Sequence, residues 1–351
     1  MSTMTDPHVG GVPEDAPASP LLGTGRLLLA PDVIAADRTR WLEARRGGIG
    51  ASEAAMLLDL APERVGGRYT LYHRKRQGLE SGDTAAMERG RYLEPYVADQ
   101  YADTHPQVDL RRGGLYCHAD RPWMLASPDR MASEWEHRVA AGVVKPATWP
   151  VELKTSIPED EFGQEGEFTY LPAYHRAQGL WQMEVLGTNR VDIPVLFIRP
   201  WEVRVFTLTR DARAQRDIDL LVAAGEEMMW RLENDRPPPV DATPACTDTL
   251  RKLYPGLEDR AVKVPIELAR RYRGWLAHRA MAEERLNLAR NEILERMGNA
   301  TRAVAIDREL GRPRDGWMVK VASRTAGRVK RHTIKAKRRV DRMNPSGWAR
   351  G

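Results

Sequence analysis

The sequence predicts an α/β protein: a mixed central β-sheet flanked by helices, then a C-terminal helical and β extension and a basic tail. Two observations favour this class. Segments with a helical repeat of apolar residues alternate along the chain with short strand-like segments. The strand-like segments come as a group of three and a group of two around one helix, an order typical of a compact mixed sheet.

The expected helices share apolar residues spaced by three or four positions. In the helix that begins near Ala86, for example, Leu93, Val97 and Tyr101 form one buried stripe. Helices are expected over about 41–45, 53–60, 71–76, 86–101, 173–186, 212–233 and 266–297. Strands are expected at 115–118, 123–126, 151–155, 191–198 and 202–207, with a further pair at 303–310 and 317–323.

Charge separates the end of the chain from the rest. The whole sequence has 54 Lys+Arg and 49 Asp+Glu, a net charge of +5, whereas residues 312–351 hold 13 Lys+Arg against two acids, a net of +11. The first 311 residues therefore carry 5 − 11 = −6. A tail of this charge is expected to contact a polyanion, and Trp317 and Trp348 beside it could stack on bases.

Composition excludes several classes of protein. The two cysteines, Cys117 and Cys246, can supply neither a disulfide framework nor a four-cysteine metal site, which indicates a reducing, cytoplasmic location. No apolar run reaches the ~20 residues of a membrane helix, so no membrane association is expected.

Four regions are expected along the chain. Residues 1–24 are rich in Pro, Gly, Ser and Asp and are predicted to be disordered. Residues 25–236 form the α/β domain, and a Pro237–Pro239 linker opens a helical region over 237–311. The basic strand and tail occupy 312–351.

The most informative residues are Asp129 and, 23 positions later, the run Glu152-Leu153-Lys154. Side chains alternate along a strand, so Glu152 and Lys154 share one face while Leu153 points to the other. If Asp129 ends the neighbouring strand, two carboxylates and the Leu153 carbonyl converge on a site suited to Mg²⁺ or Mn²⁺. The alternative is an exposed cross-strand ion pair between Glu152 and Lys154, which the local pattern by itself favours.

Four blocks of sequence in register resemble the lambda-exonuclease/YqaJ-type viral recombinase family of the PD-(D/E)xK nuclease superfamily. They span about residues 40–210 and predict a restriction-endonuclease-like core. The blocks are Arg45-Arg46-Gly47-Gly48-Ile49-Gly50-Ala51-Ser52-Glu53, Gly90-Arg91-Tyr92-Leu93-Glu94, Ser127-Pro128-Asp129 with Glu152-Leu153-Lys154, and Pro172-Ala173-Tyr174-His175-Arg176-Ala177-Gln178 continuing to Met183 and Gly187.

The resemblance implies a role for each matching residue. Asp129, Glu152 and the Leu153 carbonyl match metal ligands, and Glu94 matches the helix carboxylate that completes the site directly or through water. Lys154 matches the catalytic lysine. The family's glutamine near the nucleophile is Gln178, whereas the second glutamine, usual two residues later, is replaced here by Leu180.

The resemblance also implies a receptor for a terminal 5′-phosphate, formed by Arg45 and Ser52 with Ser127 as a helper. The residue types agree with this role, because an arginine binds phosphate bidentately and a glycine loop lets backbone approach an anion. The alternative is an ordinary Ser52 helix cap with glycines that serve a turn.

Other candidates have simpler explanations. The 130–150 connection contains Glu134 and Glu136, which are expected on a solvated loop rather than at the metal. Cys117-His118 lacks further zinc ligands and is expected to be a buried cysteine beside a histidine. His175 is expected on a helix surface, with an approach to DNA as the alternative that its place in the fourth block offers. Trp181 and Met183 are expected to pack against the sheet. The 266–297 helix is expected to pack on its own domain or, alternatively, to form an oligomer surface.

These residues predict a Mg²⁺-dependent deoxyribonuclease acting on linear duplex DNA. The resemblance adds 5′ to 3′ polarity from a 5′-phosphate, 3′ single strands for phage-type recombination, a trimeric ring and a single-strand annealing partner. Two alternatives stay open: an endonuclease or nickase with the same metal site, and a non-catalytic DNA-binding protein that uses the basic tail.

Overall fold

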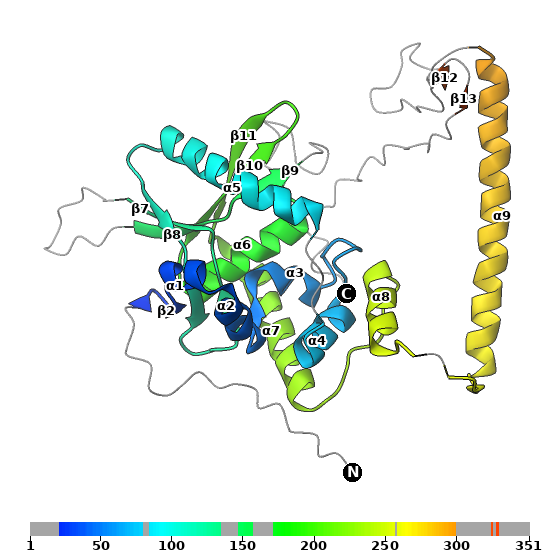
Figure 1. Ribbon diagram of the computed structural model, residues 1–351, viewed down its shortest axis with the longest axis horizontal. Helices are drawn as coiled ribbons and strands as arrows, with labels where there is room; N and C mark the ends of the chain where they lie inside the picture. Colours follow the sequence, from blue (N-terminus) through cyan, green and yellow to red (C-terminus); the bar gives the residue numbers. More distant parts are fainter. Residues whose placement is uncertain are drawn as a thin grey trace, which may run out of the picture. The chain divides into compact units, whose positions relative to one another are not determined.

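The computed structural model describes residues 21–79, 84–134, 147–156, 171–256, 258–299, 324–325 and 328–329. The chain divides into two compact units, residues 1–256 and residues 257–351. The first contains mixed sheets flanked by helices, so the predicted α/β class is confirmed (Figure 1). The domain boundaries expected from the sequence stay a prediction.

The first unit has two sheets. One has the strand order β1-β2-β5-β6-β3 and the other the order β11-β10-β8-β7-β4, with β9 paired to β10. The strands of the first sheet are β1 (Leu21–Leu22), β2 (Gly25–Leu29), β3 (Ile49–Gly50), β5 (Leu115–His118) and β6 (Met124–Ala126). Those of the second are β4 (Asp109–Arg112), β7 (Arg130–Glu134), β8 (Ala147–Val151), β9 (Lys154–Ser156), β10 (Arg190–Phe197) and β11 (Glu202–Thr209).

Helices cover both faces of the second sheet (Figure 1). Helix α5 (Ala85–Thr104) packs on one face, where Val97 and Tyr101 meet Trp149, Val151 and Leu153. Helix α6 (Ala173–Leu186) lies on the opposite side, in a cluster with β10. Because side chains alternate between the two faces of a sheet, Leu153 points toward α5 and Glu152 points toward α6.

Three further helices of this unit complete the core that supports α6. Apolar residues of α3 (Ala54–Leu57), α4 (Arg68–Gln77) and α7 (Ala212–Glu233) join α6 and β10 in one buried cluster, which fixes α6 against the sheet. Helices α1 (Pro31–Ala36) and α2 (Arg38–Arg46) pack in a separate cluster with β2, β5 and β6, and α8 (Pro244–Leu253) follows α7.

Three expectations need correction. Part of the 130–150 connection is not a loop, because β7 and β8 pair as antiparallel strands with Arg130 opposite Val151. Residues 1–24 were expected to be disordered, but a β-strand begins at Leu21, since Leu21–Leu22 pairs with Gly25–Arg26. The expected 53–60 helix is shorter: a 3₁₀ turn, Ala51–Glu53, leads into α3, which ends at Leu57. The expected strands at 303–310 and 317–323 lie outside the described residues.

The second unit contains the long helix α9 (Ile266–Met297), which confirms the helix expected there. None of the residues described in this helix is buried. Two short strands, β12 (Arg324–Thr325) and β13 (Arg328–Val329), pair antiparallel. Whether α9 packs on its own domain or joins other copies stays a prediction. Across the described residues, no helix combines the length and apolar character that crossing a bilayer requires.

Candidate active site

Strand register brings Asp129 and Glu152 together. Asp129 immediately precedes β7, and Glu152 immediately follows β8, so the antiparallel pairing of Arg130 with Val151 makes the two acids neighbours. The Asp129 carboxylate accepts a hydrogen bond from the backbone N–H of Leu153 at 2.8 Å. The backbone N–H of Glu152 is in turn held by the Asp192 carbonyl of β10 at 2.9 Å. The sheet therefore fixes the backbone on which both acids stand.

The Glu152 carboxylate is the most heavily hydrogen-bonded group of the site. It is only 4% exposed. Its Oε1 accepts from Lys154 Nζ and from Gln178 Nε2, both at 2.5 Å, and its Oε2 accepts from Gln182 Nε2 at 2.7 Å. The expected grouping of Glu152, Lys154 and Gln178 is thus present, and Glu152 and Lys154 are not the exposed ion pair of the simpler explanation.

Gln182 is a site residue that the sequence reasoning missed. It lies one helical turn after Gln178 on α6, is fully buried, and its carbonyl Oε1 has no hydrogen-bond partner among the described residues. Leu180, where the resemblance placed a second glutamine, is buried in the core cluster. A search for a second amide four positions after Gln178, rather than two, would have found Gln182, because i and i+4 share one helix face.

Burial and mutual repulsion set the electrostatics of the acids. Burial, and then the neighbouring charge of Glu152, raise the pKa of Asp129 well above its usual value. For Lys154, burial lowers the pKa, but the carboxylates of Glu152 and Asp129 outweigh it and the net shift is upward. Lys154 therefore stays an ammonium ion at neutral pH.

Glu94 lies near these acids but is engaged elsewhere. Its charge contributes to the raised pKa of Asp129. However, its Oε1 accepts a hydrogen bond from Arg130 Nη1 at 2.7 Å, and the same nitrogen donates to the Asp129 carbonyl. Direct metal ligation by Glu94 would require this ion pair to open, whereas contact through water would not.

The donor set fits a hard divalent cation. Two buried carboxylates of like charge are mutually destabilising, and a cation between them would remove that repulsion. Within the described parts of the chain, no three His, Cys, Asp or Glu side chains are grouped closely enough to hold a metal by themselves. Mg²⁺ does not require such a cage, because it commonly binds through one or two carboxylates and keeps waters and substrate phosphate as its other ligands.

Arg45 and Ser52 meet as the sequence predicts. Arg45 Nη2 donates to Ser52 Oγ at 2.8 Å, and the N-caps of the 3₁₀ turn and of α3 are Gly50 and Glu53, so the serine is not the helix cap of the simpler explanation. The backbone of Gly50 lies directly under the guanidinium: a Cβ built there would stand 2.9 Å from Arg45 Nη2. A side chain at position 50 would therefore displace the guanidinium from its present place. The Gly50 N–H, however, is taken by the Glu53 carboxylate at 2.8 Å, so it is not a free donor for an anion.

Trp41 is a second residue that the sequence reasoning missed at this site. It lies four residues before Arg45 on α2, and the guanidinium stacks over its ring at 4.6 Å from the centroid. The indole Nε1 donates to Ser127 Oγ at 3.3 Å, which links Ser127 to the same group. Trp41 could have been found from the sequence, because it lies four residues before Arg45 and residues at this spacing share one helix face.

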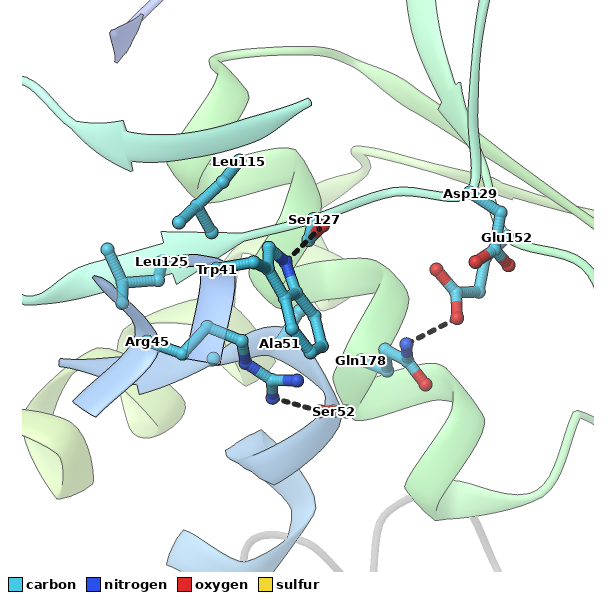
Figure 2. Close-up of a pocket in the computed structure, with 11 residues that line it drawn as sticks. Trp41, Arg45, Ala51, Ser52, Leu115, Leu125, Ser127, Asp129, Glu152 and Gln178 are labelled. Carbon is cyan, nitrogen blue, oxygen red and sulfur yellow. Dashed lines mark hydrogen bonds between the residues drawn. The ribbon is translucent and has the colours of Figure 1, made fainter. Parts of the chain in front are cut away.

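The two groups of residues line one pocket (Figure 2). Arg45, Trp41 and Ser52 stand on one side of it, Asp129 and Glu152 on the other, with Gln178 directed at Glu152. Arg45, Ser52, Ser127, Asp129, Glu152 and Gln178 therefore face a common space. A phosphorylated chain end bound at Arg45 would have its neighbouring backbone beside the two carboxylates.

The remaining candidates are located as follows. Cys117 is a buried free cysteine with the buried His118 beside it, as expected, and His118 Nδ1 accepts from the backbone N–H groups of Asp120 and Arg121. His175 is not a surface residue: it is half-buried, and burial and the charge of Lys154 lower its pKa well below the usual value. Trp181 and Met183 are buried in the core as expected. Glu134 lies in β7, and Glu136 is outside the described residues.

The fold and this pocket define an α/β protein with an acidic, lysine-containing site on adjacent strands of a mixed sheet. The model of the YqaJ-like viral recombinase domain matches residues 40–189, a range that contains every predicted site residue and also Gln182 and Trp41. The family resemblance expected from the four sequence blocks is therefore confirmed over this region of the chain.

Solved exonuclease structures resemble the chain at low identity. Two such structures are of LHK-Exo, the alkaline exonuclease of Laribacter hongkongensis, and one of them contains dAMP. Their sequences are 21% and 20% identical to this chain, and each has a TM-score of 0.41. Each match covers 56% of this chain and 95% of the exonuclease chain. A phage-related exonuclease from Haemophilus somnus is 8% identical, with a TM-score of 0.37 and coverage of 54% and 96%. These likenesses carry no conclusion about activity. No curated protein matches the sequence significantly.

Proposed function

We propose that the protein is a Mg²⁺-dependent exodeoxyribonuclease that degrades linear duplex DNA 5′ to 3′ from a 5′-phosphate end and leaves 3′ single strands for phage-type recombination. One observation supports this most strongly: the residues suited to a terminal phosphate line the same pocket as Asp129, Glu152 and Gln178 of the hydrolytic group. A 5′-phosphate receptor beside a hydrolytic site favours cleavage near an end, rather than within a duplex.

Each residue has a defined task in this proposal. Asp129, Glu152 and the Leu153 carbonyl would hold the cation, which supplies an activated water and charge neutralisation when bound. Lys154 remains protonated beside the reacting phosphate and stabilises the negative charge that develops on its oxygens. Gln178 is within reach of the same carboxylate oxygen as Lys154 and can orient the attacking water through its amide. Arg45, with Ser52 and Ser127, would bind the terminal phosphate.

The test is digestion of end-labelled linear duplex with a 5′-phosphate, the same duplex with a 5′-hydroxyl, and a closed circle, each with Mg²⁺ and with EDTA. Mononucleotide release from the phosphorylated duplex, Mg²⁺ dependence and an intact circle are expected. Cleavage of the circle would instead favour the endonuclease alternative. DNA binding without any Mg²⁺-dependent release would favour the non-catalytic alternative.

Assembly and partners form a separate part of the proposal. Family resemblance suggests a trimeric ring around DNA and a single-strand annealing protein as partner. Sedimentation of the purified full chain tests the first, with a single species at three times the monomer mass of 39.7 kDa as the expected result. A monomer at micromolar concentration would reject the ring.

A further inference from the structure

A buried ion pair lies directly beneath the Arg45 loop and joins Glu53, the last residue of the first sequence block, to Lys75, which belongs to none of the four blocks. Lys75, on α4, places its Nζ 2.7 Å from Glu53 Oε2 and 3.1 Å from the carbonyl oxygen of Arg45. The two charged side chains are only 8% and 16% exposed. Neither residue is among those that line the pocket.

The pair is joined to the pocket through the glycine loop. Besides Lys75, Glu53 Oε2 accepts the N–H of Gly50 at 2.8 Å. A Cβ built on Gly50 would lie 2.9 Å from Arg45 Nη2 and 3.3 Å from Glu53 Oε2, so the guanidinium and this carboxylate are separated by little more than that glycine. Lys75 thus holds the loop at two points, the Glu53 side chain and the Arg45 main chain.

The charge of Glu53 would oppose anion binding if it stood alone. Burial raises the pKa of this carboxyl, but the cations of Lys75 and Arg45 outweigh it and the net shift is downward, so the group is ionised at neutral pH. Burial also lowers the pKa of Lys75. The charge of Glu53 raises that pKa again but offsets only part of the lowering. A buried anion beside Arg45 would compete with an incoming phosphate for the guanidinium unless another cation neutralises it.

We propose that Lys75 and Glu53 are a positioning pair that sets the selectivity of the pocket for 5′-phosphate ends. Glu53 fixes the Gly50 backbone, and Lys75 neutralises Glu53 so that the Arg45 guanidinium keeps its charge for the ligand. This inference rests on the proposed phosphate-receptor function of Arg45. It adds two residues that do not touch the ligand but control the group that does.

The experiment compares kcat/KM on 5′-phosphate and 5′-hydroxyl duplexes of equal sequence for the full-length protein. Lys75→Met leaves Glu53 uncompensated, so the phosphate-to-hydroxyl ratio should fall about tenfold or more. The double variant Lys75→Met/Glu53→Gln removes both charges while the glutamine oxygen still accepts the Gly50 N–H, so most of the ratio should return. Arg76→Met, which removes an exposed cation from the same helix, should leave the ratio unchanged.

Recovery in the double variant separates this role from a merely structural one, because a structural pair would leave the double variant as impaired as the single. An unchanged ratio in Lys75→Met, or no recovery in the double variant, overturns the inference. Should Lys75→Met fail to fold, the double variant carries the test by itself: it must prefer 5′-phosphate ends. A wild-type protein without phosphate preference would reject the proposed function instead.

Discussion

Replacing Gln182 by methionine tests whether a buried amide orients the Glu152 carboxylate. The substitution keeps nearly the same volume at a position that is 0% exposed, so packing changes little. It removes the only donor that the described residues give to Glu152 Oε2, a hydrogen bond of 2.7 Å. A hydrogen bond to a charged group contributes about 1.5–3 kcal/mol, and loss of such a second contact commonly weakens metal binding about 10- to 100-fold.

The assay follows the unfolding temperature against Mg²⁺ concentration, which reports metal binding without requiring catalysis. The midpoint for Gln182→Met should move to about 10- to 100-fold higher Mg²⁺. Gln77→Met, at the exposed end of α4, removes an amide far from the site and serves as the matched control. If Gln182→Met and wild type share one Mg²⁺ midpoint, the amide does not orient the ligand.

Three further outcomes are expected. Lys154→Met should abolish nucleotide release while anisotropy shows duplex binding within about threefold of wild type; retained cleavage would remove Lys154 from the chemistry. Because the pKa of Asp129 is raised in the fold, its contribution to stability in EDTA is present at low pH and is lost as pH rises through the folded pKa. Asp129→Asn should therefore unfold at a higher temperature than wild type in EDTA at pH 8, yet gain nothing from Mg²⁺; a lower unfolding temperature would contradict this. Asp192→Ala should cost about 3 kcal/mol, because Tyr101, Trp149 and Thr207 all donate to this fully buried carboxylate. Urea unfolding measures that cost, with exposed Asp248→Ala as control, and a loss below about 1 kcal/mol would show that the network is not stabilising.

The strand and helix periodicities located most of the core elements. The stripe of Leu93, Val97 and Tyr101 predicted α5 and its buried face, because a 3.6-residue repeat is readable without knowing the partner. The antiparallel strands β7 and β8 were missed. Pro150 and the long insertion after Glu134 obscure their alternation, and only the pairing partner makes them strands.

The site was predicted where residue type and spacing carry the information and was missed where contact depends on packing. Glu152, Lys154 and Gln178 belong to recognisable blocks, and the structure brings them together. Gln182 and Trp41 lie one helical turn from Gln178 and Arg45, so their spacing offered a signal, but only the packing shows that their side chains reach Glu152 and Ser127.

The sequence by itself determined the α/β class, the family resemblance of residues 40–189 and several of the residues that line the pocket, because these depend on local periodicity and on motifs in register. The tertiary structure decided which polar and charged groups pair with one another. Arg130 forms an ion pair with Glu94, Gln182 donates a hydrogen bond to Glu152, and Lys75, on another helix, forms an ion pair with Glu53. Such pairings join residues distant in the chain or on separate elements, and electrostatic partners are fixed by distance in space, which no spacing along the sequence specifies.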